Sequence, residues 1–239
     1  MKVVAIISAR MTSSRLPGKS LMKICGDPVL QHMLTRVKRA KLIDTIIVAT
    51  TVNKTDDCIN DLCRKMKISC FRGPEQDVLK RYYLAAKKYN VDPIVRLTAD
   101  CPMIDPALID ETISVFQRGK WEYVTNAHGH YPDGMDTEIF TFAALEKAHL
   151  KAKHTFAREN VTTYIAGNIP KYGKGKFKRH TIKRNKDFSH IRWTLDTADD
   201  LKIIRELTSK LPKNYSWMEA LSVATKNTKL LGTKVTKRK

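Results

Sequence analysis

Short apolar segments alternate with amphipathic segments along the first 118 residues, and this alternation constrains the fold more than any other feature of the sequence. The apolar segments are rich in β-branched residues and have the length of buried strands, at residues 3–8, 45–51, 68–71 and 93–98. The amphipathic segments have helical spacing, at residues 28–37 (with Asp27 as the cap), 56–66, 78–89 and 106–116. Parallel strands need long crossovers, usually helices. The sequence therefore predicts an α/β fold, with a mainly parallel (mixed) sheet and helices on both faces.

After Gly119 the expected elements become shorter and less regular. We expect strands at residues 123–125, 138–142, 178–183 and 191–195. We expect helices at residues 143–151, 156–166, 198–211 and 217–224. We interpret residues 1–225 as a single domain with an insertion at about 126–190, and residues 226–239 as a basic tail.

The formal net charge of +20, from 44 Lys and Arg against 24 Asp and Glu, favours an anionic partner. It leaves open nucleic acid, a membrane surface and polyanionic small molecules. The sequence has no helix-turn-helix, zinc-finger or RNA-recognition signature, which argues against nucleic acid. Much of the excess charge lies in two acid-free runs, at residues 160–186 and 226–239.

A cytoplasmic location is expected from three features of the sequence. No apolar run approaches the roughly 20 residues that a bilayer requires, so no membrane insertion is predicted. Met1 leads almost directly into the first expected strand, without the cleavage site typical of a signal peptide. Five cysteines, an odd number with no Cys-x-x-Cys pair, fit reduced thiols better than a disulfide framework.

A basic loop at residues 9–20 follows the first expected strand, and we call it the phosphate loop. It contains Arg10, Arg15 and Lys19, four hydroxyl side chains and a Pro-Gly turn. Arginine engages phosphate oxygens bidentately, and lysine adds a compact charge. Ligands of such sheets bind beyond the carboxyl ends of the strands, so the position favours a phosphate site over a merely solvated basic loop. The nucleoside-triphosphatase loop is a poor match, because Ser13 stands where that motif needs its first glycine.

Two aspartates, Asp100 and Asp196, each follow an expected strand and are predicted to face one cleft at the same sheet edge. Mg²⁺ bound with a nucleoside triphosphate usually takes one or two protein carboxylates, so this pair suffices. Helix capping is the alternative role for Asp196, which precedes an expected helix. Asp105 is interpreted as a cap, because it directly precedes Pro106.

The phosphate loop and three further segments, taken in order, resemble the sugar cytidylyltransferase family, which includes the CMP-sugar synthetases for Kdo and sialic acid. The further segments are Phe71-Arg72-Gly73 through Tyr83, Arg96 through Pro106, and Arg192-Trp193-Thr194-Leu195-Asp196-Thr197. The resemblance spans about residues 2–210 and is greatest to the spore coat polysaccharide biosynthesis protein F group. It implies a glycosyltransferase-A-like nucleotide-binding fold. Ala99 departs from the family pattern, where glycine is expected.

The resemblance also implies a reaction: a sugar hydroxyl attacks the α-phosphate of CTP, giving a CMP-sugar and pyrophosphate for surface polysaccharide or glycan biosynthesis. Mg²⁺ is the implied cofactor, with Asp100 and Asp196 as its ligands. The implied catalytic residues are Arg10, Arg15, Lys19, Asp100 and Asp196. The implied nucleotide-binding residues are Ala9, Arg10, Ser13, Arg15, Gly18, Lys19, Arg72, Gly73 and Asp77. For the loop around Arg72 and Asp77, an ordinary turn before a helix is an equally good interpretation.

A third polar segment at residues 131–138 supplies the expected sugar site. Asp133, Asp136 and Glu138 surround a Pro-Asp-Gly turn, and carboxylates accept hydrogen bonds from sugar hydroxyls. An acidic hairpin turn is the alternative. Arg158 is a further candidate, for a carboxylate of the substrate.

Two other functions remain as alternatives, a nucleotide-sugar-dependent glycosyltransferase of the same fold and a nucleic-acid-binding protein. The glycosyltransferase needs an Asp-x-Asp metal site, and residues 100–102 offer only one aspartate. The substrates that the resemblance implies are CTP and a sugar or sugar acid. By resemblance we expect a homodimer, with the segment at about 126–190 serving sugar binding and dimerisation. Trp193 and Trp217 are expected in the core or at an interface.

Overall fold

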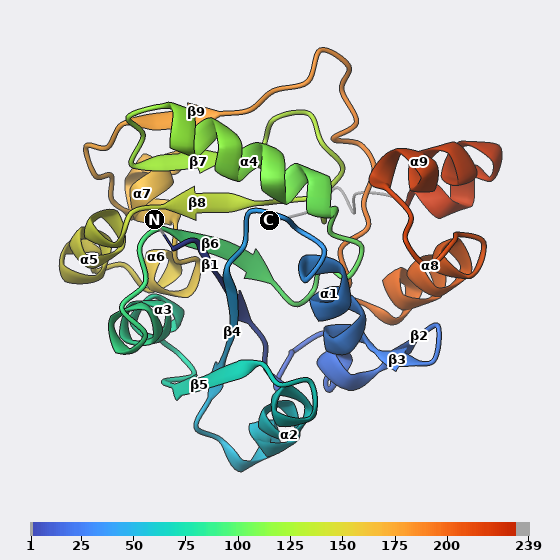
Figure 1. Ribbon diagram of the computed structural model, residues 1–239, viewed down its shortest axis with the longest axis horizontal. Helices are drawn as coiled ribbons and strands as arrows, with labels where there is room; N and C mark the ends of the chain where they lie inside the picture. Colours follow the sequence, from blue (N-terminus) through green and yellow to red (C-terminus); the bar gives the residue numbers. More distant parts are fainter. Residues whose placement is uncertain (1, 233–239) are drawn as a thin grey trace.

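A twisted seven-stranded sheet organises residues 2–232, the part of the chain that the computed structural model describes (Figure 1). Its strand order is β5-β4-β1-β6-β8-β7-β9. The strands are β1 Val4–Ser8, β4 Thr45–Thr51, β5 Ser69–Gly73, β6 Ile94–Thr98, β7 Tyr123–Thr125, β8 Glu138–Phe140 and β9 Arg179–Thr181. β1, β4, β5 and β6 are parallel, whereas β8 is antiparallel to both β6 and β7. This mixed sheet confirms the predicted fold class.

Helices cover both faces of the sheet, as predicted (Figure 1). One face packs against α1 Val29–Val37, α2 Asp57–Lys65, α4 Pro106–Arg118, α8 Ala198–Ser209 and α9 Trp217–Lys226. The other packs against α3 Val78–Lys88, α5 Phe142–Lys151, α6 Thr155–Glu159 and α7 Thr163–Ala166. Side chains alternate between the faces of a strand. Along β1, Ala5 and Ile7 therefore enter the first core, and Val4 and Ile6 enter the second.

The register of the central strands places two loops side by side. Ser8 at the end of β1 pairs with Thr98 at the end of β6, so the chain leaves both strands at the same edge. The Ala99 N–H continues this contact by donating to the Ser8 carbonyl at 3.1 Å. The Leu195 N–H donates to the Asp100 carbonyl at 2.7 Å. Three segments distant in sequence therefore meet at this edge.

Three sequence predictions are wrong in detail. The expected helix at residues 156–166 is split into α6 and α7, with Val161 between them at a positive φ of 25°. Within residues 2–232, the expected strand at 191–195 pairs with no other strand and makes one isolated bridge, between Asp133 and Arg192. Asp27 does not cap α1: it lies in a short strand β3 (Asp27–Pro28), paired with β2 (Lys23–Ile24).

The segment after α9 packs onto the body of the protein. A 3₁₀ turn, η4 (Thr228–Leu231), buries Leu230, whose carbonyl accepts a hydrogen bond from the Trp193 indole at 2.9 Å. Trp193 and Trp217 are both buried, which confirms their predicted place in the core. The rest of the predicted basic tail, residues 233–239, lies outside the described residues.

No helix within residues 2–232 combines the length and the apolar character needed to cross a membrane.

Candidate active site

The phosphate loop is folded onto itself and anchored to the neighbouring strand loop. The Gly18 N–H donates to the Met11 carbonyl at 2.8 Å, and Gly18 adopts a left-handed φ of 75°. The Ser20 hydroxyl donates to the Arg10 carbonyl at 3.1 Å. The Met11 N–H donates to the carboxylate of Asp56 at 2.8 Å. A glycine at position 18 permits this turn, because other residues rarely adopt such a φ.

Asp56 is a buried carboxylate that the sequence analysis did not single out. It accepts hydrogen bonds from the hydroxyls of Thr50 and Thr51 as well as from the Met11 N–H. Burial alone would raise the pKa of Asp56, but these hydrogen bonds hold it below its ordinary value. Asp56 is therefore an ionised anchor for the residue that follows Arg10.

The ammonium group of Lys19 lies between the two predicted metal ligands. It is 3.1 Å from Asp196 Oδ1 and 3.5 Å from Asp100 Oδ2, and it donates to the Leu195 carbonyl at 2.8 Å. The side chain of Lys19 is only 14% exposed. The structure thus brings together three residues that the sequence analysis assigned to one site.

Two arginines bind the other oxygen of Asp196. Arg15 Nη2 is 2.9 Å and Arg192 Nη2 is 2.6 Å from Asp196 Oδ2. Burial alone would raise the pKa of Asp196, but Lys19 and the two arginines hold it below its ordinary value. Asp196 is therefore ionised and surrounded by three cations.

Helix α8 is capped by residues next to Asp196 and not by Asp196 itself. Thr197 is the N-cap of α8, and its hydroxyl accepts from the Asp200 N–H in a capping box. The Asp200 carboxylate accepts in return from the N–H groups of Asp196 and Thr197. Asp105 does cap α4, accepting from the Ala107 N–H at 2.7 Å, as predicted.

Arg192 connects Asp196 to the expected sugar segment. Besides Asp196, it binds Asp133 at 2.7 Å and approaches Asp200 at 3.7 Å. The second oxygen of Asp133 accepts from the Thr194 hydroxyl at 2.9 Å. Arg192 lies in a family-like motif of the sequence, but the motif alone did not predict its role. Its position four residues before Asp196 is the sequence feature that could have indicated an ion pair with Asp196.

Two adjoining cavities meet at Asp100 and Asp196. The first has a volume of about 340 Å³, and the phosphate loop forms one wall of it with Arg10, Ser13, Arg15 and Lys19. The second, of about 300 Å³, contains Asp133, Asp136 and Arg192 in its walls. Residues lining both cavities are Arg15, Arg96, Thr98, Asp100, Asn160 and Asp196. The arrangement provides two neighbouring binding spaces with the acid pair between them.

Among the acidic residues of the second cavity, Asp136 has the most strongly shifted pKa. Burial, with the nearby carboxylates of Asp133 and Glu138, raises its pKa to about 7. Within residues 2–232 no hydrogen bond or ion pair reaches its carboxyl group. Its hydrogen-bonding capacity is therefore available to a ligand.

The remaining predicted nucleotide-site residues lie off the cavity walls. Gly18 shapes the turn of the phosphate loop, and Gly73 ends β5. Arg72 pairs with Asp57 at 2.6 Å and donates to two backbone carbonyls, those of Thr51 and Asn53.

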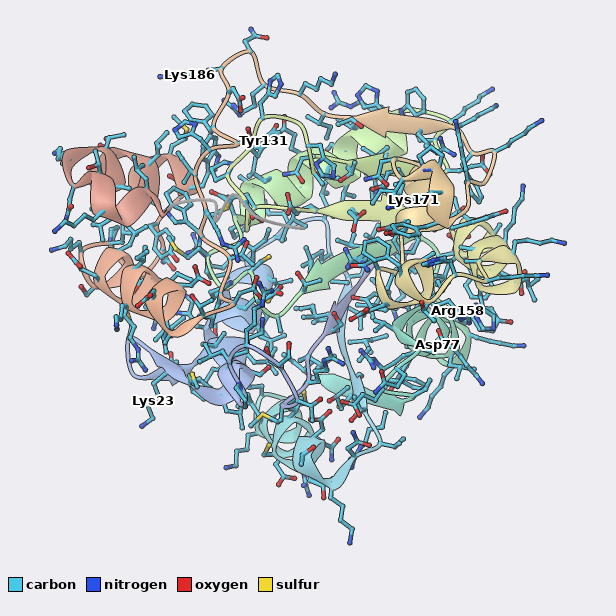
Figure 2. The ribbon with its side chains drawn as sticks, turned by 180° about the vertical axis from the view of Figure 1, so that it is seen from behind. Lys23, Asp77, Tyr131, Arg158, Lys171 and Lys186 are labelled. Carbon is cyan, nitrogen blue, oxygen red and sulfur yellow. The ribbon has the colours of Figure 1, made fainter. Side chains whose placement is uncertain are left out.

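Asp77, from the same predicted set, caps α3. It accepts from the Lys80 N–H at 2.9 Å and pairs with Arg158 at 2.7 Å. Figure 2 shows Asp77 and Arg158 next to each other, where α3 meets α6.

Two of the predicted sugar-site residues have structural partners of their own. Arg158 donates to the carbonyls of His149 and Ala152 in addition to its pair with Asp77. Glu138 pairs with Arg96 and accepts from the Tyr123 hydroxyl at 2.5 Å. Arg96 itself borders both cavities, so Glu138 reaches the site through Arg96.

The long basic run at residues 160–186 lies largely outside the site. Its lysines are exposed, and Figure 2 shows Lys186 at the edge of the molecule. Only Asn160 of this run borders the cavities. The eight basic residues of this run therefore have no place in the walls of the two cavities.

Asp100 and Asp196 have the chemistry that a hard divalent cation prefers. Both side chains are carboxylates, and each borders the two cavities. The Lys19 ammonium lies close to both of them. No group of three potential metal-ligating side chains was found within residues 2–232. A metal ion here would therefore take two protein carboxylates, with phosphate oxygens and water completing its coordination.

The fold and this site define a nucleotidyltransferase, and comparison with known proteins gives the family. The family model described as Cytidylyltransferase matches residues 4–231. The chain belongs to the cytidylyltransferase family, as its motifs predicted.

Two curated relatives match most of the chain. The uncharacterised protein MJ1063 of Methanocaldococcus jannaschii is 41% identical over 209 residues, covering 87% of this chain and 83% of its own. The spore coat polysaccharide biosynthesis protein SpsF of Bacillus subtilis is 31% identical over 215 residues, covering 87% of each chain. The resemblance to the SpsF group is thereby confirmed.

Solved structures agree with the fold. A cytidylyltransferase from Leptospira borgpetersenii superposes with a TM-score of 0.90 at 35% identity, covering 100% of both chains. A CMP-2-keto-3-deoxy-manno-octonic acid synthetase solved with CTP superposes with a TM-score of 0.65 at 18% identity, covering 88% of this chain and 99% of that one. The second likeness shows the shared fold alone.

Proposed function

We propose that this cytidylyltransferase activates a sugar acid, joining it to the CMP part of CTP and releasing pyrophosphate. One observation carries the proposal: Lys19, Asp100 and Asp196 form a cluster where two cavities meet, beside a basic loop at the carboxyl edge of the sheet. A transfer between two substrates needs two adjacent binding spaces with charge neutralisation between them.

The first cavity suits the nucleotide. Arg10, Arg15 and Lys19 supply cations for the triphosphate, and the loop backbone is already held by its contacts with Asp56 and Ser20. Choice of CTP is supported by the family, whose model is described as Cytidylyltransferase. Choice of a sugar acid is supported by relatives described as 3-deoxy-manno-octulosonate cytidylyltransferases, one of them 34% identical over 48% of this chain.

The second cavity suits the sugar. Asp133 is held by Arg192 and Thr194, and the free carboxyl of Asp136 accepts hydrogen bonds from the sugar's hydroxyl groups. This arrangement brings the attacking hydroxyl to the acid pair, next to the α-phosphate in the first cavity. Holding two reactants side by side is the larger part of catalysis in such transfers.

Asp100 and Asp196 would hold Mg²⁺. When bound, the metal supplies charge neutralisation at the α-phosphate and lowers the pKa of the attacking hydroxyl. The protein's own cations then neutralise the departing pyrophosphate, with Arg15 and Lys19 already within 4 Å of Asp196. No histidine is needed as a base.

We further propose a cytoplasmic homodimer that serves surface polysaccharide biosynthesis. The name of the SpsF relative supports the pathway, and five free thiols fit a reducing compartment.

We propose that the segment at about residues 126–190 serves sugar binding and dimerisation. That segment contributes β8 and β9 to the sheet, so it is integral to the fold. Light scattering after size-exclusion chromatography measures the oligomeric state, and a monomer would contradict the dimer.

Pyrophosphate release tests the proposed reaction. The protein is incubated with Mg²⁺, each of the four nucleoside triphosphates in turn, and a panel of sugars and sugar acids. We expect release only with CTP and a sugar acid, and loss of release in Asp100→Asn and Lys19→Ala. Transfer from a nucleotide sugar without pyrophosphate would indicate the glycosyltransferase alternative. Absence of turnover together with strongly salt-dependent nucleic-acid binding would indicate the nucleic-acid-binding alternative.

A further inference from the structure

Both carboxylate oxygens of Asp196 are already bound by cations of the protein. Oδ1 lies 3.1 Å from the Lys19 ammonium, and Oδ2 lies 2.9 Å from Arg15 and 2.6 Å from Arg192. A metal ion that binds Asp196 must therefore displace or crowd at least one of these groups. The contacts of each cation indicate which one moves.

Arg192 is the cation held most firmly. It has three carboxylate partners, Asp133, Asp196 and Asp200, and is only 12% exposed. Arg15 is 61% exposed, and its one ion pair within residues 2–232 is with Oδ2 of Asp196, whereas Lys19 approaches Oδ1. Neither arginine contacts Asp100. Lys19 is the one cation of these three that approaches both predicted metal ligands, which places its ammonium between them.

The side chain of Lys19 can leave this position without moving the loop. Its backbone is held by the turn hydrogen bond to the Leu16 carbonyl, and its neighbour Ser20 is held by Arg10. A lysine side chain is a flexible stem with a compact charge at its tip. The same stem borders the first cavity, where the triphosphate of the proposed substrate would lie. Lys19 thus has two alternative anions within its reach, the acid pair and the triphosphate.

We propose that the Lys19 ammonium and the divalent metal compete for one position between Asp100 and Asp196 and exchange when the nucleotide binds. The metal then enters together with the triphosphate, as its chelate, and does not load ahead of it. The triphosphate makes the exchange favourable because it offers Lys19 new anionic partners. This inference rests on the proposed function, but its test does not require turnover.

Binding of Mn²⁺ to the protein without nucleotide tests the competition directly. Mn²⁺ favours the same oxygen ligands as Mg²⁺, and its free concentration is read from its electron paramagnetic resonance signal. We expect Lys19→Met to bind Mn²⁺ at least tenfold more tightly than the wild type, because the competing charge is gone while an unbranched side chain only one atom shorter is kept. The matched control is Lys23→Met, an exposed lysine at the β2–β3 hairpin (Figure 2), and it should bind Mn²⁺ like the wild type.

Two further measurements locate the effect. The double variant Lys19→Met with Asp196→Asn should lose the gain in Mn²⁺ affinity, which places the additional binding at the acid pair. Adding CTP to the wild type should increase Mn²⁺ binding more than the free nucleotide's own chelation explains. Lys19→Gln provides a second uncharged side chain, and circular dichroism confirms that each variant is folded.

The proposal is overturned if Lys19→Met and Lys19→Gln, both folded, bind Mn²⁺ no more tightly than the wild type. It is also overturned if the wild type binds Mn²⁺ equally tightly with and without CTP. If either result is found while the protein still releases pyrophosphate with CTP, the proposed exchange is wrong and the proposed function stands. Absence of pyrophosphate release with every substrate pair, alongside the expected Mn²⁺ gain, would overturn the proposed function and leave the competition for the acid pair supported.

Discussion

Arg192 donates from one end of its guanidinium to Asp196 at 2.6 Å and from the other to Asp133 at 2.7 Å. One side chain therefore joins the proposed metal ligand to the proposed sugar segment. A planar guanidinium makes two such contacts at fixed separation, which a lysine cannot do.

Replacing Arg192 with lysine should lower kcat/KM by about 10–100-fold, the usual cost of losing a partner that orients a metal ligand. Arg205→Lys is the matched control, because Arg205 lies on α8 and donates to the Lys23 carbonyl away from both cavities. Steady-state kinetics measure the effect. A purely structural role predicts reduced thermal stability with unchanged kcat and KM, and that outcome would refute the positioning role.

Asp56 should control both the phosphate loop and acid stability. Because the pKa of Asp56 is held below its ordinary value, its stabilisation is present above a pH of about 4 and is lost as the pH falls toward the folded-state pKa. Asp56→Asn should therefore lower the free energy of unfolding at pH 7 by about 1–3 kcal/mol and should weaken its pH dependence below about pH 4. Urea unfolding from pH 3 to 7 measures this difference. A parallel pH dependence in wild type and variant would contradict the account.

Asp136 should have the opposite effect on stability. Its pKa is raised to about 7, so the folded protein retains a proton that the unfolded chain has lost, and stability falls as the pH rises from about 4 to 7. Asp136→Asn should remove this penalty. The change that the variant causes in the free energy of unfolding should therefore be more favourable at pH 8 than at pH 4, by at most about 4 kcal/mol. Urea unfolding at the two pH values measures this difference.

The same variant, Asp136→Asn, should raise KM for the sugar about tenfold, which corresponds to one lost hydrogen bond of about 1.4 kcal/mol. KM for CTP should change little, because Asp136 borders only the second cavity. Equal increases in both KM values would contradict this assignment.

The pair of Asp77 and Arg158 should act on stability more than on binding. Asp77 caps α3 and neither residue borders either of the two cavities described above, so Asp77→Ala should lower the free energy of unfolding by about 1 kcal/mol. KM for CTP is expected to remain within about threefold of the wild-type value, the equivalent of less than 1 kcal/mol. Thermal unfolding and CTP titration measure the two effects. A large increase in KM for CTP at unchanged stability would restore the nucleotide-binding role that the motif suggested.

The regular elements were predictable from the sequence because β-strands buried on both faces are almost continuously apolar. β1 and β4 show this pattern plainly. Residues 191–195 have the same pattern for a different reason: Trp193 and Leu195 are buried, but the chain meets η4 and the loop at Asp133 instead of a strand. A one-dimensional pattern reports burial and does not identify the partner that provides it.

The candidate site was predictable where a charge lies in a loop that follows a strand at the carboxyl edge, as for Lys19 after β1 and Asp100 after β6. Asp196 was also predicted, although the buried segment before it joins no strand of the sheet. The site was not predictable where the role of a residue depends on a distant partner. Arg158 meets Asp77, 81 residues earlier, and Arg192 meets Asp133, 59 residues earlier. Asp56 was missed because its partners are the backbone of Met11 and two hydroxyls, which leave no charge pattern.

The central claim is that Asp100 and Asp196 serve the transfer of CMP to a sugar acid. Mass spectrometry of a reaction containing CTP, Mg²⁺ and a mixture of sugar acids tests this claim most directly. The account predicts one CMP conjugate, formed in equal amount with pyrophosphate by the wild type and by Arg205→Lys, and absent with Asp196→Asn. A conjugate formed equally well by Asp196→Asn, or pyrophosphate without any conjugate, would contradict it.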